Sequence, residues 1–114
     1  GPDLPDPSGV VAGGGPQGGD GVANAARVVA GMQAGFRRCY QRSLAEDPNA
    51  SGGVRLEIRI GPDGDVTSAT ATPTGNLSKN ALACIEARAR AGVFARPKGG
   101  SATLVVPFTL EPAQ

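Results

Sequence analysis

The feature that most constrains the fold of this chain is the strict alternation of apolar and charged residues over positions 54–60. The alternating residues are Val54, Arg55, Leu56, Glu57, Ile58, Arg59 and Ile60. Successive side chains of a strand point to opposite faces, so the run predicts a strand with one face on a core and the other in water. Gly61-Pro62-Asp63-Gly64 follows and supplies turn residues. We therefore expect residues 65–72 to pair back antiparallel, as a β-hairpin.

Helical periodicity surrounds this hairpin on both sides. From Val22 to Leu44 apolar residues recur at the spacing of one helix face, and Pro48 ends the pattern. After Pro73 and Gly75, either Asn76 or Ser78 can cap a second helix that extends to about residue 91. The element order to this point is helix, strand, strand, helix.

The last predicted strand is the β-rich run over residues 102–110, which completes an α+β order of α-β-β-α-β. Pro107 lies inside it and has no backbone N–H to donate to a ladder. A proline in a strand is tolerated at the edge of a sheet and is costly in its interior. We therefore expect this strand to be an edge of the sheet. Its unpaired backbone groups could bind a partner strand, or Pro107 could serve only to prevent unwanted pairing with other chains.

Composition divides the chain into a linker, one domain and a short tail. Residues 1–21 are rich in Gly and Pro and have few apolar residues, which is typical of a flexible linker. Gly1-Pro2 resembles the remnant that tag-removing proteases leave, and indicates a piece of a longer protein. The domain is expected over residues 22–111 and the tail over 112–114.

The residue inventory argues against several classes of function. The formal net charge is only +1, so nucleic acid is a poor candidate partner. The chain has no histidine, which removes the Ser-His-Asp and Cys-His catalytic arrangements, and the two cysteines are too few for a structural zinc site. We expect no enzyme activity, no cofactor and no metal. Cys39 and Cys84 are either a disulfide or two buried thiols.

Several short motifs, taken in order, resemble a known family. They are Phe36-Arg37-Arg38-Cys39-Tyr40, Gly61-Pro62-Asp63-Gly64-Asp65-Val66, Gly75-Asn76, Ala83-Cys84-Ile85-Glu86, Val93-Phe94 with Pro97, and Val105-Val106-Pro107-Phe108. From residue 54 onward the order resembles the C-terminal domain of TonB. With the cysteine-containing motifs it is more similar to the AgmX/PglI C-terminal domain family of myxobacterial gliding-motility proteins. Many relatives have an aromatic residue before Phe94, where this chain has Val93.

The resemblance implies two helices packed on one face of a three-stranded antiparallel sheet, with the first strand central and the last strand at an edge. It also implies that Cys39 and Cys84 lie on neighbouring helices, where an oxidising periplasm would allow a disulfide.

The function implied by the resemblance is that of a periplasmic interaction module in a parent protein anchored in the inner membrane. Such a module transmits force or signal to the outer membrane by strand addition, in which an extended peptide of an outer-membrane or periplasmic protein pairs with the edge strand. The expected partner-binding strand is Thr103, Leu104, Val105, Val106, Pro107, Phe108 and Thr109, flanked by Arg38 and Arg42. The exposed edge would also allow a strand-swapped homodimer.

Two alternatives remain open from the sequence. The domain could energise an outer-membrane transporter as TonB does, or it could bind peptidoglycan as a structural module. The first shares the same edge-strand chemistry and differs in its partner.

Overall fold

A computed structural model describes residues 10–13 and 15–112 of the chain. Within this part, the elements follow one another as β1 (Val10–Gly13), β2 (Gln17–Gly18), α1 (Ala25–Glu46), β3 (Gly52–Ile60), β4 (Val66–Pro73), α2 (Lys79–Arg90) and β5 (Ala102–Glu111). The expected tag remnant and the last two residues of the tail lie outside the described residues.

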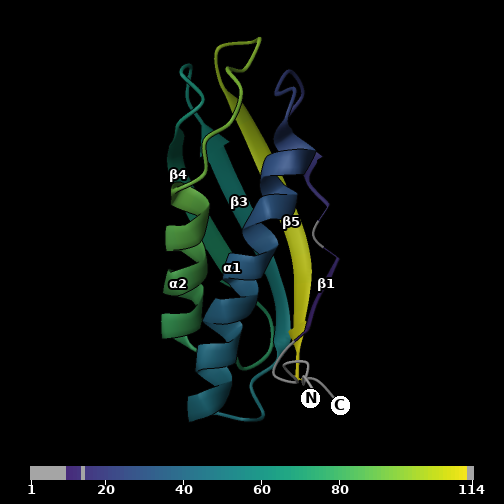
Figure 1. Cartoon of the computed structure of the whole chain (residues 1–114), viewed down its shortest axis with the longest axis vertical. Helices are drawn as coiled ribbons and strands as arrows, with labels where there is room; N and C mark the ends of the chain where they lie inside the picture. The colour runs from purple at the N-terminus through teal and green to yellow at the C-terminus, as the bar shows by residue number, and fades with distance from the viewer. Residues whose placement is uncertain (1–9, 14, 113–114) are drawn as a thin grey trace, which may run out of the picture.

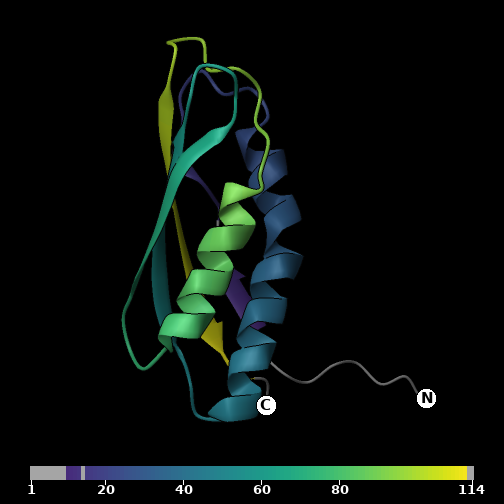
Figure 2. The same cartoon turned by 90° about the vertical axis from the view of Figure 1, so that its left-hand side faces the viewer.

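The fold is α+β, and both α1 and α2 lie on the same face of an antiparallel sheet, as Figures 1 and 2 show. This confirms the predicted class. The number of strands was wrong: over the described residues the sheet has five strands, in the order β1-β5-β3-β4, with β2 beside β5. The two additional strands lie within the segment predicted to be a flexible linker, and they place β5 inside the sheet.

The first helix forms because apolar residues repeat along a single face. Its buried residues are Ala25, Val29, Met32, Phe36, Cys39, Tyr40 and Ser43. The Phe36 ring stacks on that of Phe108 in β5, with 5.1 Å between ring centroids. The Tyr40 hydroxyl donates to the carbonyl oxygen of Ala50 in the loop after the helix. These contacts fix α1 against β5 and against the start of β3.

The second helix begins at a serine cap. The Ser78 hydroxyl accepts a hydrogen bond from the Ala81 N–H at 3.0 Å, which satisfies one of the free donors of the first turn. Asn76, the other candidate cap, instead accepts from the Ser51 N–H at 2.9 Å and so ties the loop before β3 to the loop after β4.

The predicted hairpin is confirmed, because β3 and β4 pair antiparallel along their length. At the turn, the Gly61 N–H donates to the Asp65 carbonyl at 2.8 Å. Gly64 has a φ of +91°, and a Cβ atom there would lie 2.1 Å from the Phe94 carbonyl oxygen. Only glycine fits this close approach.

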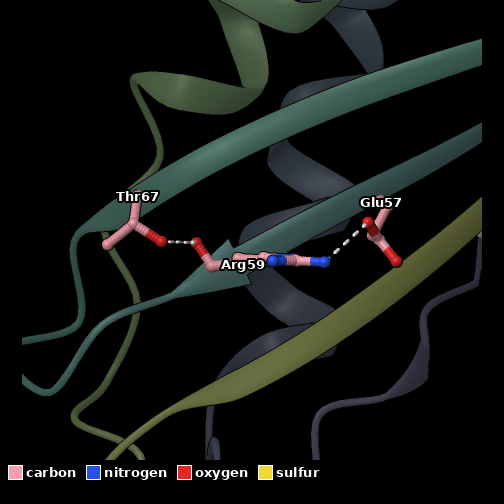
Figure 3. A network of polar contacts seen from close by, with 3 residues as sticks. All are labelled: Glu57, Arg59 and Thr67. Carbon is pink, nitrogen blue, oxygen red and sulfur yellow. Dashed lines mark hydrogen bonds and ion pairs between the residues drawn. The ribbon is translucent and has the colours of Figure 1, made fainter.

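The core lies between the sheet and the two helices. Alternate residues of β3 and β5 point into it, in agreement with the sequence pattern: Val54, Leu56, Ile58, Ile60, Leu104, Val106, Phe108 and Leu110 are all buried. The opposite face of the sheet carries Arg55, Glu57 and Arg59. The Arg59 guanidinium lies 3.7 Å from the Glu57 carboxylate, and the Thr67 hydroxyl donates to the Arg59 carbonyl. Figure 3 shows these contacts.

Candidate functional site: the outer edge of β5

The candidate site is the row of backbone groups on the side of β5 that faces away from β3. The Gly19 N–H donates to the Thr103 carbonyl at 3.0 Å, so the polar groups of Thr103 point outward. Backbone groups alternate in direction along an antiparallel strand. The N–H and C=O groups of Val105, Thr109 and Glu111 therefore also point outward, and those of Leu104 and Phe108 point to β3.

The same alternation explains how β5 accommodates Pro107. The missing N–H of Pro107 falls on the outward side, so the ladder between β5 and β3 loses no donor there. The register pairs Pro107 with Arg55 without interruption. Pro107 therefore costs the ladder with β3 no donor, but the predicted edge strand was wrong, because β5 is paired on both sides.

Two short strands cover the outward side of β5. β1 pairs antiparallel with β5, from Val10 opposite Glu111 to Gly13 opposite Phe108. β2 continues the ladder with Gln17 opposite Val105 and Gly18 opposite Leu104. The expectation of an exposed edge at β5 is thus corrected: a segment about 90 residues away in sequence already lies along it.

The register changes between β1 and β2. From Gly13 to Gln17 the chain advances four residues, while β5 advances three, from Phe108 to Val105. The ladder with β5 is therefore interrupted opposite Val106 and Pro107, and β1 and β2 pair with β5 as two separate strands.

The helix side of this site differs from the prediction. Gln33 of α1 reaches β1, and its side-chain amide donates to the Gly13 carbonyl at 3.1 Å. Arg38 and Arg42, the predicted flanking residues, instead line hollows between α1 and α2, Arg38 beside Arg88 and Arg42 beside Asn80. The structure therefore does not bring the two arginines to the outer edge of β5, because they lie on the side of α1 that faces the second helix.

The two cysteines are joined. The Cys39 and Cys84 sulfurs are 2.06 Å apart and the Cα atoms 5.7 Å apart, so the bond ties the middle of α1 to the middle of α2. Beside it lies a hollow of about 250 Å³. Both polar and apolar residues line it: Cys39, Arg42, Ser43, Glu46, Ser78, Asn80, Ala81 and Cys84.

The other edge of the sheet is protected by a side chain. The Glu86 carboxylate of α2 accepts a hydrogen bond from the Ala71 N–H of β4 at 2.8 Å. The register of β3 and β4 turns the polar groups of Thr70 and Thr72 toward β3, so those of Ala71 face out. Glu86 thereby occupies a donor that a foreign strand would need, and Pro73 at the end of β4 supplies none.

The sequence contained a weak signal for the covering strands. Val10-Val11-Ala12 is the one short apolar run in the glycine-rich segment, and two of its residues are β-branched. Among the described residues, no group of three or more His, Cys, Asp or Glu side chains could hold a metal ion. In the same part of the chain, no helix is long and apolar enough to cross a membrane.

Comparison with protein-family models, with curated proteins and with solved structures finds no match for this chain. The geometry of β5 and its neighbours is therefore the basis for the functional argument.

Proposed function

We propose that this domain is a protein-interaction module that binds an extended peptide by strand addition along the outward side of β5. The observation that supports the proposal is that this side already pairs with an antiparallel segment that is remote in sequence. Main-chain hydrogen bonds supply most of such an interaction, so the site can accept strands of varied sequence. The opposite edge, at β4, is obstructed by Glu86 and is the poorer candidate.

The proposed setting is the periplasm, as part of an envelope-spanning gliding-motility machine whose parent chain is anchored in the inner membrane. The resemblance to the AgmX/PglI and TonB C-terminal domains supports this setting. A disulfide between Cys39 and Cys84 also fits an oxidising compartment. In this role the domain transmits force or signal to an outer-membrane or periplasmic partner that offers an extended peptide.

The test is an NMR titration of the isotope-labelled chain with periplasmic peptides from candidate outer-membrane partners. Strand addition should shift the outward amides of Val105 and Thr109 more than the inward amides of Leu104 and Phe108. Val105→Pro removes one outward donor and should weaken binding by about tenfold, the worth of roughly one hydrogen bond. Val105→Thr keeps the donor and the β-branched shape, and should bind as the parent chain does.

A different outcome would refute the proposal. If peptides leave β5 unperturbed while cell-wall fragments shift residues on the helices, the domain binds peptidoglycan and not an added strand.

A further inference from the structure

We propose that residues 10–18, which we call the arm, are a displaceable occupant of the β5 edge, so that a partner strand must replace the arm to bind. This inference rests on the proposed function and adds its regulation. The described part of the arm comprises β1, residues 15 and 16, and β2. The outward side of β5 can then pair with a partner strand only when the arm leaves it.

The first argument is the contrast between the two neighbours of β5. On its inner side β3 contributes four buried side chains, Val54, Leu56, Ile58 and Ile60. Among the arm residues whose burial the structure describes, Val11 packs partly against the core and Pro16 is half-buried, while Ala12, Gly13, Gly15, Gln17 and Gly18 are exposed. Both neighbours make backbone ladders, but burial of apolar surface stabilises β3 far more than the arm. Segments with few buried apolar contacts open locally at low free-energy cost.

The second argument is the change of register between β1 and β2. Between the pairs Gly13–Phe108 and Gln17–Val105 the arm advances four residues and β5 three, so the ladder is interrupted opposite Val106 and Pro107. A regular extended peptide can keep a single register along the whole strand. The arm is therefore a less complementary partner for β5 than a regular strand would be.

The third argument is that contacts outside the arm hold the start of α1 on the rest of the domain. Val22 is only 7% exposed and belongs to the core. The Gly21 carbonyl accepts from the Lys98 N–H at 3.1 Å, and the Asn24 side chain accepts from the Ala95 N–H at 2.8 Å. These contacts hold the start of α1 in place. The arm can leave by a change at Gly19, whose φ of +73° already turns the chain sharply between β2 and the helix.

The chemistry of the partner follows from what the arm occupies. Val11 lies opposite Leu110 and packs on the core. The Gly13 carbonyl oxygen accepts a hydrogen bond from the Gln33 side chain. The geometry fits an extended peptide, antiparallel to β5, with a branched apolar residue opposite Leu110. Ala12 and Gln17 of the arm are exposed, so the partner side chains at these positions contribute little to selection.

The first experiment is native-state hydrogen exchange on the unmodified chain. Opening of the arm alone should expose the outward amides of Val105 and Thr109, which should exchange at least about 100-fold faster than the inward amides of Leu104 and Phe108. If all four amides exchange at one rate, β1 and β2 open only when the whole sheet does, and the arm is a permanent part of the fold.

The second experiment adds a strand in trans to full-length variants. Ala12 is exposed, and its N–H faces β5 opposite Thr109. Ala12→Pro removes that donor and should release the arm, while Ala12→Ser keeps it. The probe is a synthetic peptide with the sequence of residues 10–19. A short tether gives an effective concentration in the millimolar range, so a peptide identical to the arm should bind at sub-millimolar to millimolar concentration once the arm is released.

The expected result is that the Ala12→Pro protein binds this peptide at least about tenfold more tightly than the parent chain and Ala12→Ser, with shifts at Val105 and Thr109. Equal binding to all three proteins would show that the arm does not compete for the edge, and would overturn this inference alone. If exchange shows the edge open in Ala12→Pro but the peptide causes no shifts, β5 accepts no strand in trans. That outcome would refute the proposed function as well.

Discussion

Reduction of the Cys39–Cys84 bond should destabilise the domain by about 4 kcal/mol. The bond closes a loop with a sequence separation of 45 residues. In the chain-entropy model, releasing a loop of this length returns about 4 kcal/mol of conformational freedom to the unfolded state. A small domain has a total free energy of unfolding of about 5–15 kcal/mol. The disulfide would therefore account for a large share of the stability.

The assay is urea denaturation followed by helical ellipticity, with and without dithiothreitol. For a domain of this size the free energy of unfolding falls by about 1–1.5 kcal/mol per molar urea, so the midpoint should fall by about 3–4 M on reduction. Reduction is the cleanest perturbation because it leaves every side chain in place. The double variant Cys39→Ala with Cys84→Ala should have a low midpoint that dithiothreitol does not change.

Midpoints of the oxidised and reduced proteins within about 0.5 M of each other would refute the reasoning. The unfolded chain would then already be restricted by residual structure between the two helices, and the loop-entropy argument would not apply.

Three further predictions concern single side chains. Burial, together with the negative charge of Glu111, raises the pKa of the Tyr40 phenol above its ordinary value. Tyr40 therefore stabilises the fold fully below about pH 10, and this stabilisation is lost as the pH rises through the folded-state pKa. Tyr40→Phe should therefore cost about 1 kcal/mol at pH 8, with a smaller difference at pH 11, and equal differences in the urea midpoints at both values would contradict this. Gly64→Ala should cost more than about 2 kcal/mol by thermal denaturation because of its positive φ and its contact with Phe94, while Gly99→Ala, which has open space around it, should be within about 0.5 kcal/mol of the parent. Glu86→Ala should cost about 1.5 kcal/mol by urea denaturation because it leaves the Ala71 N–H without its acceptor. Glu86→Gln keeps an oxygen at this place and should recover most of the loss. An equal loss of stability in both variants would contradict a role for this hydrogen bond.

The elements that the sequence predicted well are those whose side chains carry the signal. The alternation over residues 54–60 and the apolar stripe of α1 reflect burial, and burial selects side chains at fixed intervals. Pro107 led to the wrong prediction of an edge strand, because its missing N–H falls on the outward side of β5, where the ladder with β1 and β2 is interrupted.

The arm could not be predicted in the same way. Its pairing with β5 is made by backbone groups, and glycine-rich composition is typical of chains that stay unfolded. A ladder between segments about 90 residues apart leaves almost no trace in local pattern. Val11, half-buried against the core, is the residue that distinguishes this segment from an ordinary linker.

Arg38 and Arg42 show a second limit. Periodicity separates the polar and apolar faces of α1 but does not say which flank of the polar face meets α2 and which meets β1. The disulfide settles this rotation, because Cys39 must face α2. With Cys39 facing α2, Arg38 and Arg42 also lie on the α2 side of the helix. Gln33 lies on the opposite side, where it contacts Gly13.

The pairing of Val10 with Glu111 has a consequence for biosynthesis. The arm is translated before the rest of the domain, but its partner strand is the last of the described elements to be made. At a synthesis rate of about 5–20 residues per second, the arm waits for roughly 5–20 seconds before β5 exists. β5 also completes the core beside β3, so neither the core nor the arm can settle until translation of the domain is nearly finished. During this interval the glycine-rich composition of the arm makes the arm itself a poor nucleus for aggregation.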